Sequence, residues 1–306
     1  PSDPNNLTSE LKLTLDHENY NLVTGIQAFE NLGLSNNDRF QYILPYYDFN
    51  KNFYLDVVEG QINFTSSGSN NLNNTNKLKT RIINDLEYKS DEIISNSGFV
   101  SKFNIYLKNL GTVGKKDNTY KSSPQIELMS LYEFASEFPL RKQTKIYNNT
   151  IVPKISLRFN PSDMKNYNTE DRNINVDNLF NINRLGLSDT FEAGKSLTIG
   201  FDYKKENLND INKYFELKLG SVFRDKEENF VPTSSTLNKK NSNLFGSATN
   251  FINENLSIDY NFMIDNNLDR FEYNSITTSL IFDKFETKFN FVEENGDTGN
   301  ENFLEN

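Results

Sequence analysis

The sequence predicts an all-β protein, an antiparallel transmembrane β-barrel, and three observations support this fold class. Alternating apolar and polar residues recur along all 306 residues, which is typical of half-buried antiparallel strands. Hydrophobic residues make up only 36% of the chain, and the mean hydropathy is −0.67. The chain nevertheless carries 25 Phe and 15 Tyr residues. A barrel strand needs apolar side chains only on its lipid-facing half, and aromatic girdles mark both membrane interfaces. The core of a β-sandwich is the alternative explanation for the aromatic content.

The strand assignment follows from period-2 alternation in each segment. In Gln125–Phe138, for example, Ile126 and Leu128 share a face opposite Glu127 and Glu133. Because Asn and Asp interrupt its apolar residues, Lys79–Tyr88 is assigned as a strand and not as a helix. The other clear strands, in chain order, are Phe99–Leu107, Ile155–Phe159, Leu197–Tyr203, Leu256–Ile264 and Phe285–Phe291. No segment shows a convincing helical period.

Connections are expected where Asn, Asp, Ser and Gly gather, since these residues favour turns. At roughly 20 residues per strand and connection, the chain holds about 14 to 16 strands of a larger barrel. Pro45 lies inside a strand-like run and marks a strand start, a bulge or an edge. The expected connections are Asp16–Asn19, Asn50–Asn52, Ser66–Asn76, Gly111–Asn118, Asn160–Asn175, Arg224–Asn241, Asp265–Leu268 and Glu293–Asn302.

Composition excludes several classes of function. A formal charge of −10 argues against a nucleic-acid partner. With no Cys and a single His, His17, thiol chemistry and multi-His metal sites are excluded, and no cofactor fingerprint is present. The pairs Glu227–Glu228 and Glu293–Glu294 lie in polar connections and point to opposite faces, so we interpret them as solvated charges. A weak calcium loop at Glu293–Asn302 is a minor alternative to a solvated loop.

One charged cluster follows the strand that ends at Phe159. Arg184 can pair with Asp189 or Glu192 across a bend at Gly186, and Asp177 and Asn183 lie nearby. A desolvated Arg must find a partner. A structural pair that fixes the bend is therefore preferred over a ligand site.

The segment Asp177–Tyr203 resembles the barrel of the LptD family, the lipopolysaccharide-assembly proteins of the outer membrane, also called organic solvent tolerance proteins. The matching pattern is Asp, Phe, Asn-Arg-x-Gly and Asp, followed by an alternating strand that contains Gly. Gly25–Asn31, Phe138–Leu140 and Ser242–Ser247 agree more diffusely. The signature positions, all expected to be structural, are Asp177, Phe180, Asn183, Arg184, Gly186, Asp189, Glu192 and Gly200.

The resemblance implies that residues 1–306 are the central part of the C-terminal β-barrel domain, with the N-terminal β-jellyroll and the final strands absent. It further implies a non-enzymatic role in the outer membrane of a Gram-negative bacterium, translocating lipopolysaccharide to the outer leaflet. The implied partners are lipopolysaccharide, outer-membrane lipid, an LptE-type lipoprotein plug and a periplasmic Lpt bridge. A general porin and a secreted β-rich adhesin remain the alternatives. The polar strand faces that would line the lumen include those of Lys102, Glu127, Glu133 and Arg158.

Overall fold

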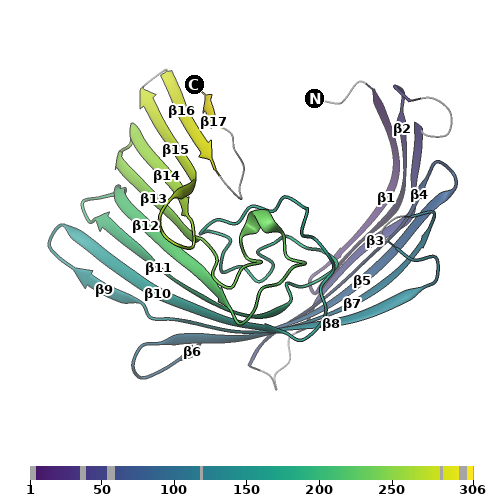
Figure 1. Ribbon diagram of the computed structural model, residues 1–306, viewed down its shortest axis with the longest axis horizontal. Helices are drawn as coiled ribbons and strands as arrows, with labels where there is room; N and C mark the ends of the chain where they lie inside the picture. Colours follow the sequence, from purple (N-terminus) through teal and green to yellow (C-terminus); the bar gives the residue numbers. More distant parts are fainter. Residues whose placement is uncertain are drawn as a thin grey trace. The chain divides into compact units, whose positions relative to one another are not determined.

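The computed structural model describes residues 5–34, 39–53, 59–117, 120–282, 285–295 and 302–305. The chain divides into two compact units. Figure 1 labels the strands along the chain. Unit 1 contains Pro1–Asp91 and Asn104–Leu131, and unit 2 contains Glu92–Phe103 and Tyr132–Asn306. Among the described residues, no helix has the length and apolar character that crossing a membrane requires.

Unit 1 is an antiparallel meander in which each strand pairs with its neighbour in the chain. Asn74 and Thr75 adopt positive φ values of 50° and 57° in a tight turn that returns the chain from β4 to β5. The strands are β1 (Asn6–His17), β2 (Tyr20–Asn31), β3 (Phe40–Phe53), β4 (Gly60–Asn73), β5 (Lys77–Ser90), most of β7 (Val100–Lys115) and the first part of β8 (Gln125–Glu137).

Unit 2 continues the same antiparallel pattern. Within it, β10 (Tyr147–Asn160) pairs with the end of β8 and with β9 (Leu140–Gln143) on one side, and with β11 (Gly194–Asn207) on the other. The short β6 (Ile93–Ile94) pairs with the start of β7. The remaining elements are β12 (Asp210–Arg224), the 3-10 turn η2 (Thr233–Ser235), β13 (Leu244–Asn253), β14 (Leu256–Ile264), β15 (Phe271–Phe282), β16 (Phe285–Glu294) and β17 (Asn302–Glu305).

The predicted all-β antiparallel class is confirmed. Fourteen of the described strands have nine residues or more, which agrees with the expected 14 to 16. The expected connections at Asp16–Asn19, Asn160–Asn175, Arg224–Asn241 and Asp265–Leu268 coincide with breaks between strands. Most of Glu293–Asn302, where the weak calcium loop was considered, lies outside the described residues.

Three expected connections are wrong over most of their length. The strands β3, β4 and β7 run on to Phe53, Asn73 and Lys115, through the predicted turns at Asn50–Asn52, Ser66–Asn76 and Gly111–Asn118. Polar side chains there bond across the sheet and do not form turns. Two such bonds join three neighbouring strands: Ser66 Oγ to Asn84 Oδ1 at 2.7 Å, and Asn84 Nδ2 to Asn109 Oδ1 at 3.2 Å.

Pro45 marks a bulge, one of the three alternatives that its position in the sequence left open. On both sides of β3 the register shifts between Ile43 and Tyr46, where two residues of β3 face one residue of each neighbouring strand. Proline donates no backbone hydrogen bond, so a bulge accommodates it without breaking a regular ladder.

In the sheet of each unit many apolar side chains are exposed and several polar ones are buried, which is the inverse of the usual arrangement in a soluble protein. In β10, Leu157 is 47% exposed whereas Ser156 and Arg158 are 1% and 6% exposed. In β8, Ile126 and Leu128 are 77% and 76% exposed. Such a continuous apolar face fits contact with lipid, and the opposite face carries the polar residues that a barrel lumen tolerates.

Two long connections fold over the polar face of unit 2, the 161–193 loop and the 225–243 loop (Figure 1). They bury a small apolar core against β12, β13 and β14. Leu179, Val231 and Leu237 are fully buried in it, beside Val222 and Phe245 of the sheet. The loops are therefore packed structure with their own hydrophobic stabilisation.

If the apolar face contacts lipid, a charge placed at Leu128 should lower the stability of the protein. Replacing Leu128 by Arg should destabilise the full-length protein in phospholipid vesicles by up to about 2–4 kcal/mol, the cost of Arg on a lipid-facing strand. Leu128→Met is the matched control and should stay close to wild type, since it conserves volume and apolarity. Urea titration followed by the folded band on unheated gels measures the difference. Equal stability of the two variants would contradict lipid contact at this face.

Candidate functional site

A buried salt bridge joins Arg184 and Glu192 in the last third of the 161–193 loop. The Arg184 side chain is fully buried, and its Nε and Nη2 atoms donate to the two Glu192 carboxylate oxygens at 2.7 and 2.6 Å. This two-point geometry is the strongest form of the Arg–carboxylate interaction. Of the two partners that the sequence offered to Arg184, the structure selects Glu192.

The remaining donors of Arg184 bind the loop to the sheet. Nη1 donates to Thr198 Oγ1 at 2.9 Å and Nη2 donates to Ser196 Oγ at 3.2 Å, and both acceptors belong to β11. Nη1 also lies 3.4 Å from the Leu179 carbonyl oxygen within the loop. One guanidinium thus joins two parts of the loop to the polar face of a strand.

Two further arginines complete what we call the arginine cluster: Arg158, Arg184, Arg224, Glu133 and Glu192. Arg224, at the end of β12, also donates to Glu192 and to the Ala193 carbonyl oxygen. Arg158 of β10 donates through Nε to Glu133 at 3.1 Å. Its Nη2 reaches two loop carbonyl oxygens, those of Phe180 and Asn181, at 2.8 Å each.

The electrostatics of the cluster keep Glu192 ionised. Burial alone would raise the pKa of Glu192, but the positive charges of Arg184 and Arg224 outweigh burial and lower this pKa to about 2. The cluster contains three cations and two carboxylates. Its members come from β8, β10, β12 and the loop.

Asp189 does not pair with Arg184, the partner that the sequence suggested for it. Its carboxylate accepts hydrogen bonds from Tyr167 and from Lys165 Nζ, the latter at 3.4 Å. These contacts join Asp189 to the start of the same loop. The 161–193 loop is therefore cross-linked internally as well as to the sheet.

The expected bend at Gly186 is present. Gly186 has a φ of +64°, which a glycine adopts without strain. Its backbone N–H donates to the Asn183 carbonyl oxygen at 3.0 Å. The Asn183 side chain closes the turn, with Nδ2 donating to the Leu187 carbonyl oxygen at 2.8 Å and Oδ1 accepting from the Leu187 N–H at 2.9 Å.

The other signature positions lie where the loop touches β11 and β12. A Cβ atom on Gly200 would come within 3.0 Å of the Phe180 ring and 2.4 Å of the Leu219 carbonyl oxygen, so the ring occupies space that only glycine leaves open. Asp177 accepts a hydrogen bond from Lys218 Nζ at 2.9 Å. Asp177, Phe180, Arg184 and Gly200 thus lie where the loop meets the sheet, whereas the side-chain contacts of Asn183 and Asp189 lie within the loop.

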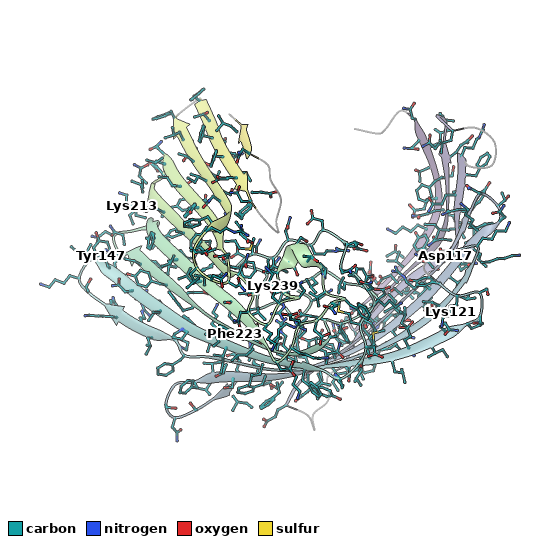
Figure 2. All side chains as sticks on the ribbon, viewed as in Figure 1. Asp117, Lys121, Tyr147, Lys213, Phe223 and Lys239 are labelled. Carbon is teal, nitrogen blue, oxygen red and sulfur yellow. The ribbon has the colours of Figure 1, made fainter. Side chains whose placement is uncertain are left out.

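Sequence reasoning placed Glu133 and Arg158 on the polar face but missed their place in this cluster, and it missed Arg224 altogether. The signal available was a charged residue near the end of each of three strands: Glu133 near the end of β8, Arg158 near the end of β10 and Arg224 at the end of β12. Figure 2 shows how densely side chains fill the space around Lys239, in the 225–243 loop. Lys102, also expected on the polar face, forms an ion pair with Glu92 at 2.9 Å.

The arrangement suits anchoring better than chemistry. Glu192 is held by two guanidinium groups, and Glu133 accepts from Ser156 Oγ at 2.7 Å as well as from Arg158. Within the described part of the chain, no group of three His, Cys, Asp or Glu residues could hold a metal ion. His17, the last residue of β1, stacks on Tyr20, the first residue of β2, and Glu228 forms an ion pair with Lys226 at 3.2 Å.

Comparison with known proteins assigns the family. The family model described as "LptD: LPS transport system D" matches residues 2–295, which is nearly the whole chain. No curated protein matches the sequence. The match confirms the resemblance drawn from Asp177–Tyr203 and gives no support to a porin or an adhesin. It agrees with antiparallel strands that expose one apolar face. The chain therefore belongs to the LptD family, the β-barrel proteins that transport lipopolysaccharide in the outer membrane.

Proposed function

We propose that residues 1–306 form barrel wall in a translocon that works with an LptE-type lipoprotein plug. In this proposal, lipopolysaccharide arrives from a periplasmic Lpt bridge through a jellyroll domain. The observation that carries the proposal is the inverted burial of the strands, together with the family match. Exposed Leu157 and Leu128 provide a lipid-facing surface, and the opposite face provides a polar path.

Within this wall we assign a structural role to the eight signature residues. The arginine cluster and the turn at Gly186 would hold the 161–193 loop against the polar face of β10, β11 and β12. A loop fixed in this way shapes the space that a polar headgroup meets on that face. The assignment draws on the contacts of Arg184, Asn183 and Phe180 with the sheet and within the loop.

Transport itself is tested with the full-length protein in cells. Depletion of the protein should remove newly made lipopolysaccharide from the cell surface, and the wild-type gene should restore it. A photo-reactive residue in place of Glu127, on the polar face, should cross-link lipopolysaccharide, whereas one in place of Ile126, on the apolar face, should cross-link mainly phospholipid. Normal surface lipopolysaccharide after depletion would overturn the proposed function.

Anchoring by Arg184 predicts a large loss of stability on truncation. Arg184→Ala leaves Glu192 buried with one partner fewer, and breaking a buried pair in this way costs about 3–5 kcal/mol. Arg184→Lys keeps the charge but loses the two-point geometry, so its stability should lie between those of wild type and Arg184→Ala. The control is Lys213→Ala, since Lys213 forms a 3.2 Å pair with Asp210 whose side chains are 45% and 38% exposed. Truncating such a pair changes stability by about 0–1 kcal/mol.

Urea titration of each full-length variant, followed by the folded band on unheated gels, gives these differences. Near-equal losses for Arg184→Ala and Lys213→Ala would contradict the anchoring role.

The low pKa of Glu192 predicts how stability depends on pH. Its pKa is about 2 in the folded protein and near the ordinary value of 4.5 in the unfolded chain. A lowered folded-state pKa contributes stability that is fully present above pH 4.5 and is lost as the pH falls toward 2. The contribution is up to about 3 kcal/mol.

The comparison is between wild type, Glu192→Gln and Glu170→Gln, each unfolded with urea at several pH values in that window. Glu192→Gln should be the less stable protein at neutral pH and should show a shallower decline on acidification. Glu170, whose side chain is 48% exposed, should leave the wild-type pH profile unchanged when replaced. A Glu192→Gln profile parallel to wild type would refute the assignment.

A further inference from the structure

Unit 1 contains a basic hollow at one end of its strands, on the polar face. Its volume is about 600 Å³. The charged residues in its lining are four cations and one carboxylate, although the whole chain carries a net charge of −10: Lys77, Lys79, Arg81, Lys116 and Asp117. An excess of positive charge at one place on an acidic protein favours an anionic ligand.

The β4–β5 hairpin places several of these residues on one face. Lys77 and Lys79 lie directly opposite Asn73 and Asn71 in the register of the two strands. Alternation puts both lysines on the side opposite Ile82, which is 41% exposed on the apolar face. Lys77 and Lys79 therefore face away from lipid, together with the side-chain amides of Asn71 and Asn73.

The segment after β7 contributes Lys116 and Asp117 to the lining of the basic hollow. Lys116 has a φ of 53° and turns the chain, and the Gly114 N–H donates to the Lys121 carbonyl oxygen at 2.8 Å. Asp117 and Lys121 mark this segment in Figure 2. Lys79 Nζ lies 4.6 Å from the centroid of the Tyr120 ring, so the ammonium group sits beside an aromatic surface.

A second hollow of about 510 Å³ adjoins the first, and we call it the amide hollow. The two share Gln41, Asn73 and Lys77. The amide hollow adds three more asparagines and the rings of Phe29 and Phe40. Side-chain amides offer both donors and acceptors, as sugar hydroxyl groups require, and ring faces provide apolar surface for stacking.

We propose that the two hollows together bind a phosphate-bearing saccharide. The phosphate would lie among Lys77, Lys79 and Lys116, and the sugar hydroxyl groups would meet the amides of Gln41 and Asn73. Cations bind phosphate through charge-assisted hydrogen bonds. The phosphorylated headgroup of a glycolipid carries both chemistries, so this inference rests on the proposed transport function and names where the headgroup is held.

The test places a photo-reactive p-benzoylphenylalanine at Leu34 in the full-length protein, an exposed position that lines the amide hollow and is not one of the proposed contacts. The probe is purified lipopolysaccharide, used intact or after chemical removal of its phosphates. The variant combines Lys77→Gln, Lys79→Gln and Lys116→Gln. The matched control combines Lys145→Gln, Lys213→Gln and Lys226→Gln, three exposed lysines of unit 2. Retention of the folded band on unheated gels shows that each protein still assembles.

Cross-linking of intact lipopolysaccharide should fall about tenfold in the variant, as expected for losing charge-assisted bonds, and should be unchanged in the control. Removing the phosphates should have the same effect as removing the lysines. Dephosphorylated lipopolysaccharide should therefore cross-link to the wild-type protein as weakly as intact lipopolysaccharide cross-links to the variant. If millimolar inorganic phosphate competes with the cross-link, the cations recognise phosphate itself. If it does not compete while the variant still loses the cross-link, they recognise phosphate as part of the headgroup. Both outcomes support a phosphate site.

Equal cross-linking of wild type and variant, or of intact and dephosphorylated lipopolysaccharide, would overturn the inference. Surface delivery of lipopolysaccharide, measured in the same strains, separates this failure from failure of the proposed function. Normal delivery with equal cross-linking rejects the saccharide site alone. Surface lipopolysaccharide that does not depend on the wild-type protein rejects transport as well.

Discussion

The pairing of Glu192 with two buried arginines is the constraint on which the inner structure of unit 2 depends. A carboxylate removed from water is unstable unless cations replace its hydration, and here Arg184 and Arg224 do so from a loop and from a strand. Because the same guanidinium groups also bind Thr198 and the Ala193 carbonyl oxygen, the position of the loop follows from satisfying one buried charge. The apolar core around Leu179 then packs behind it.

The inverted burial of the strands supplies the complementary constraint. Leu157 and Leu128 would aggregate a soluble protein, but they are the appropriate surface where the solvent is hydrocarbon. Lipid cannot hydrogen-bond to the backbone, and so the long antiparallel ladders satisfy the backbone groups within the sheet. Polar side chains are left to face inward, where Ser156 donates to Glu133 of the neighbouring strand β8 and Arg158 donates to the Phe180 carbonyl oxygen of the loop.

Much of this architecture could be predicted from the sequence, because period-2 alternation is a local signal. The strand predicted at Gln125–Phe138 corresponds to β8, and a bend lies at Gly186 as expected, where the backbone has a φ of +64°. Turn-forming residues misled where they pair across strands, as Ser66 and Asn84 do. The partners of Glu192 could not be deduced fully, since Arg224 lies 32 residues away on a strand whose register only the folded sheet defines.

The bulge at Pro45 has a geometric consequence for β3. One additional residue in this strand, relative to both neighbours, shifts the phase of its side-chain alternation by half a period. Odd-numbered residues therefore point one way before Leu44 and the other way after Pro45. Both halves of β3 can therefore direct their apolar side chains to the lipid face and their polar side chains to the opposite face, although the alternation in the sequence changes phase at Leu44 and Pro45. Removing a single residue here would oblige half of the strand to turn its lipid side inward.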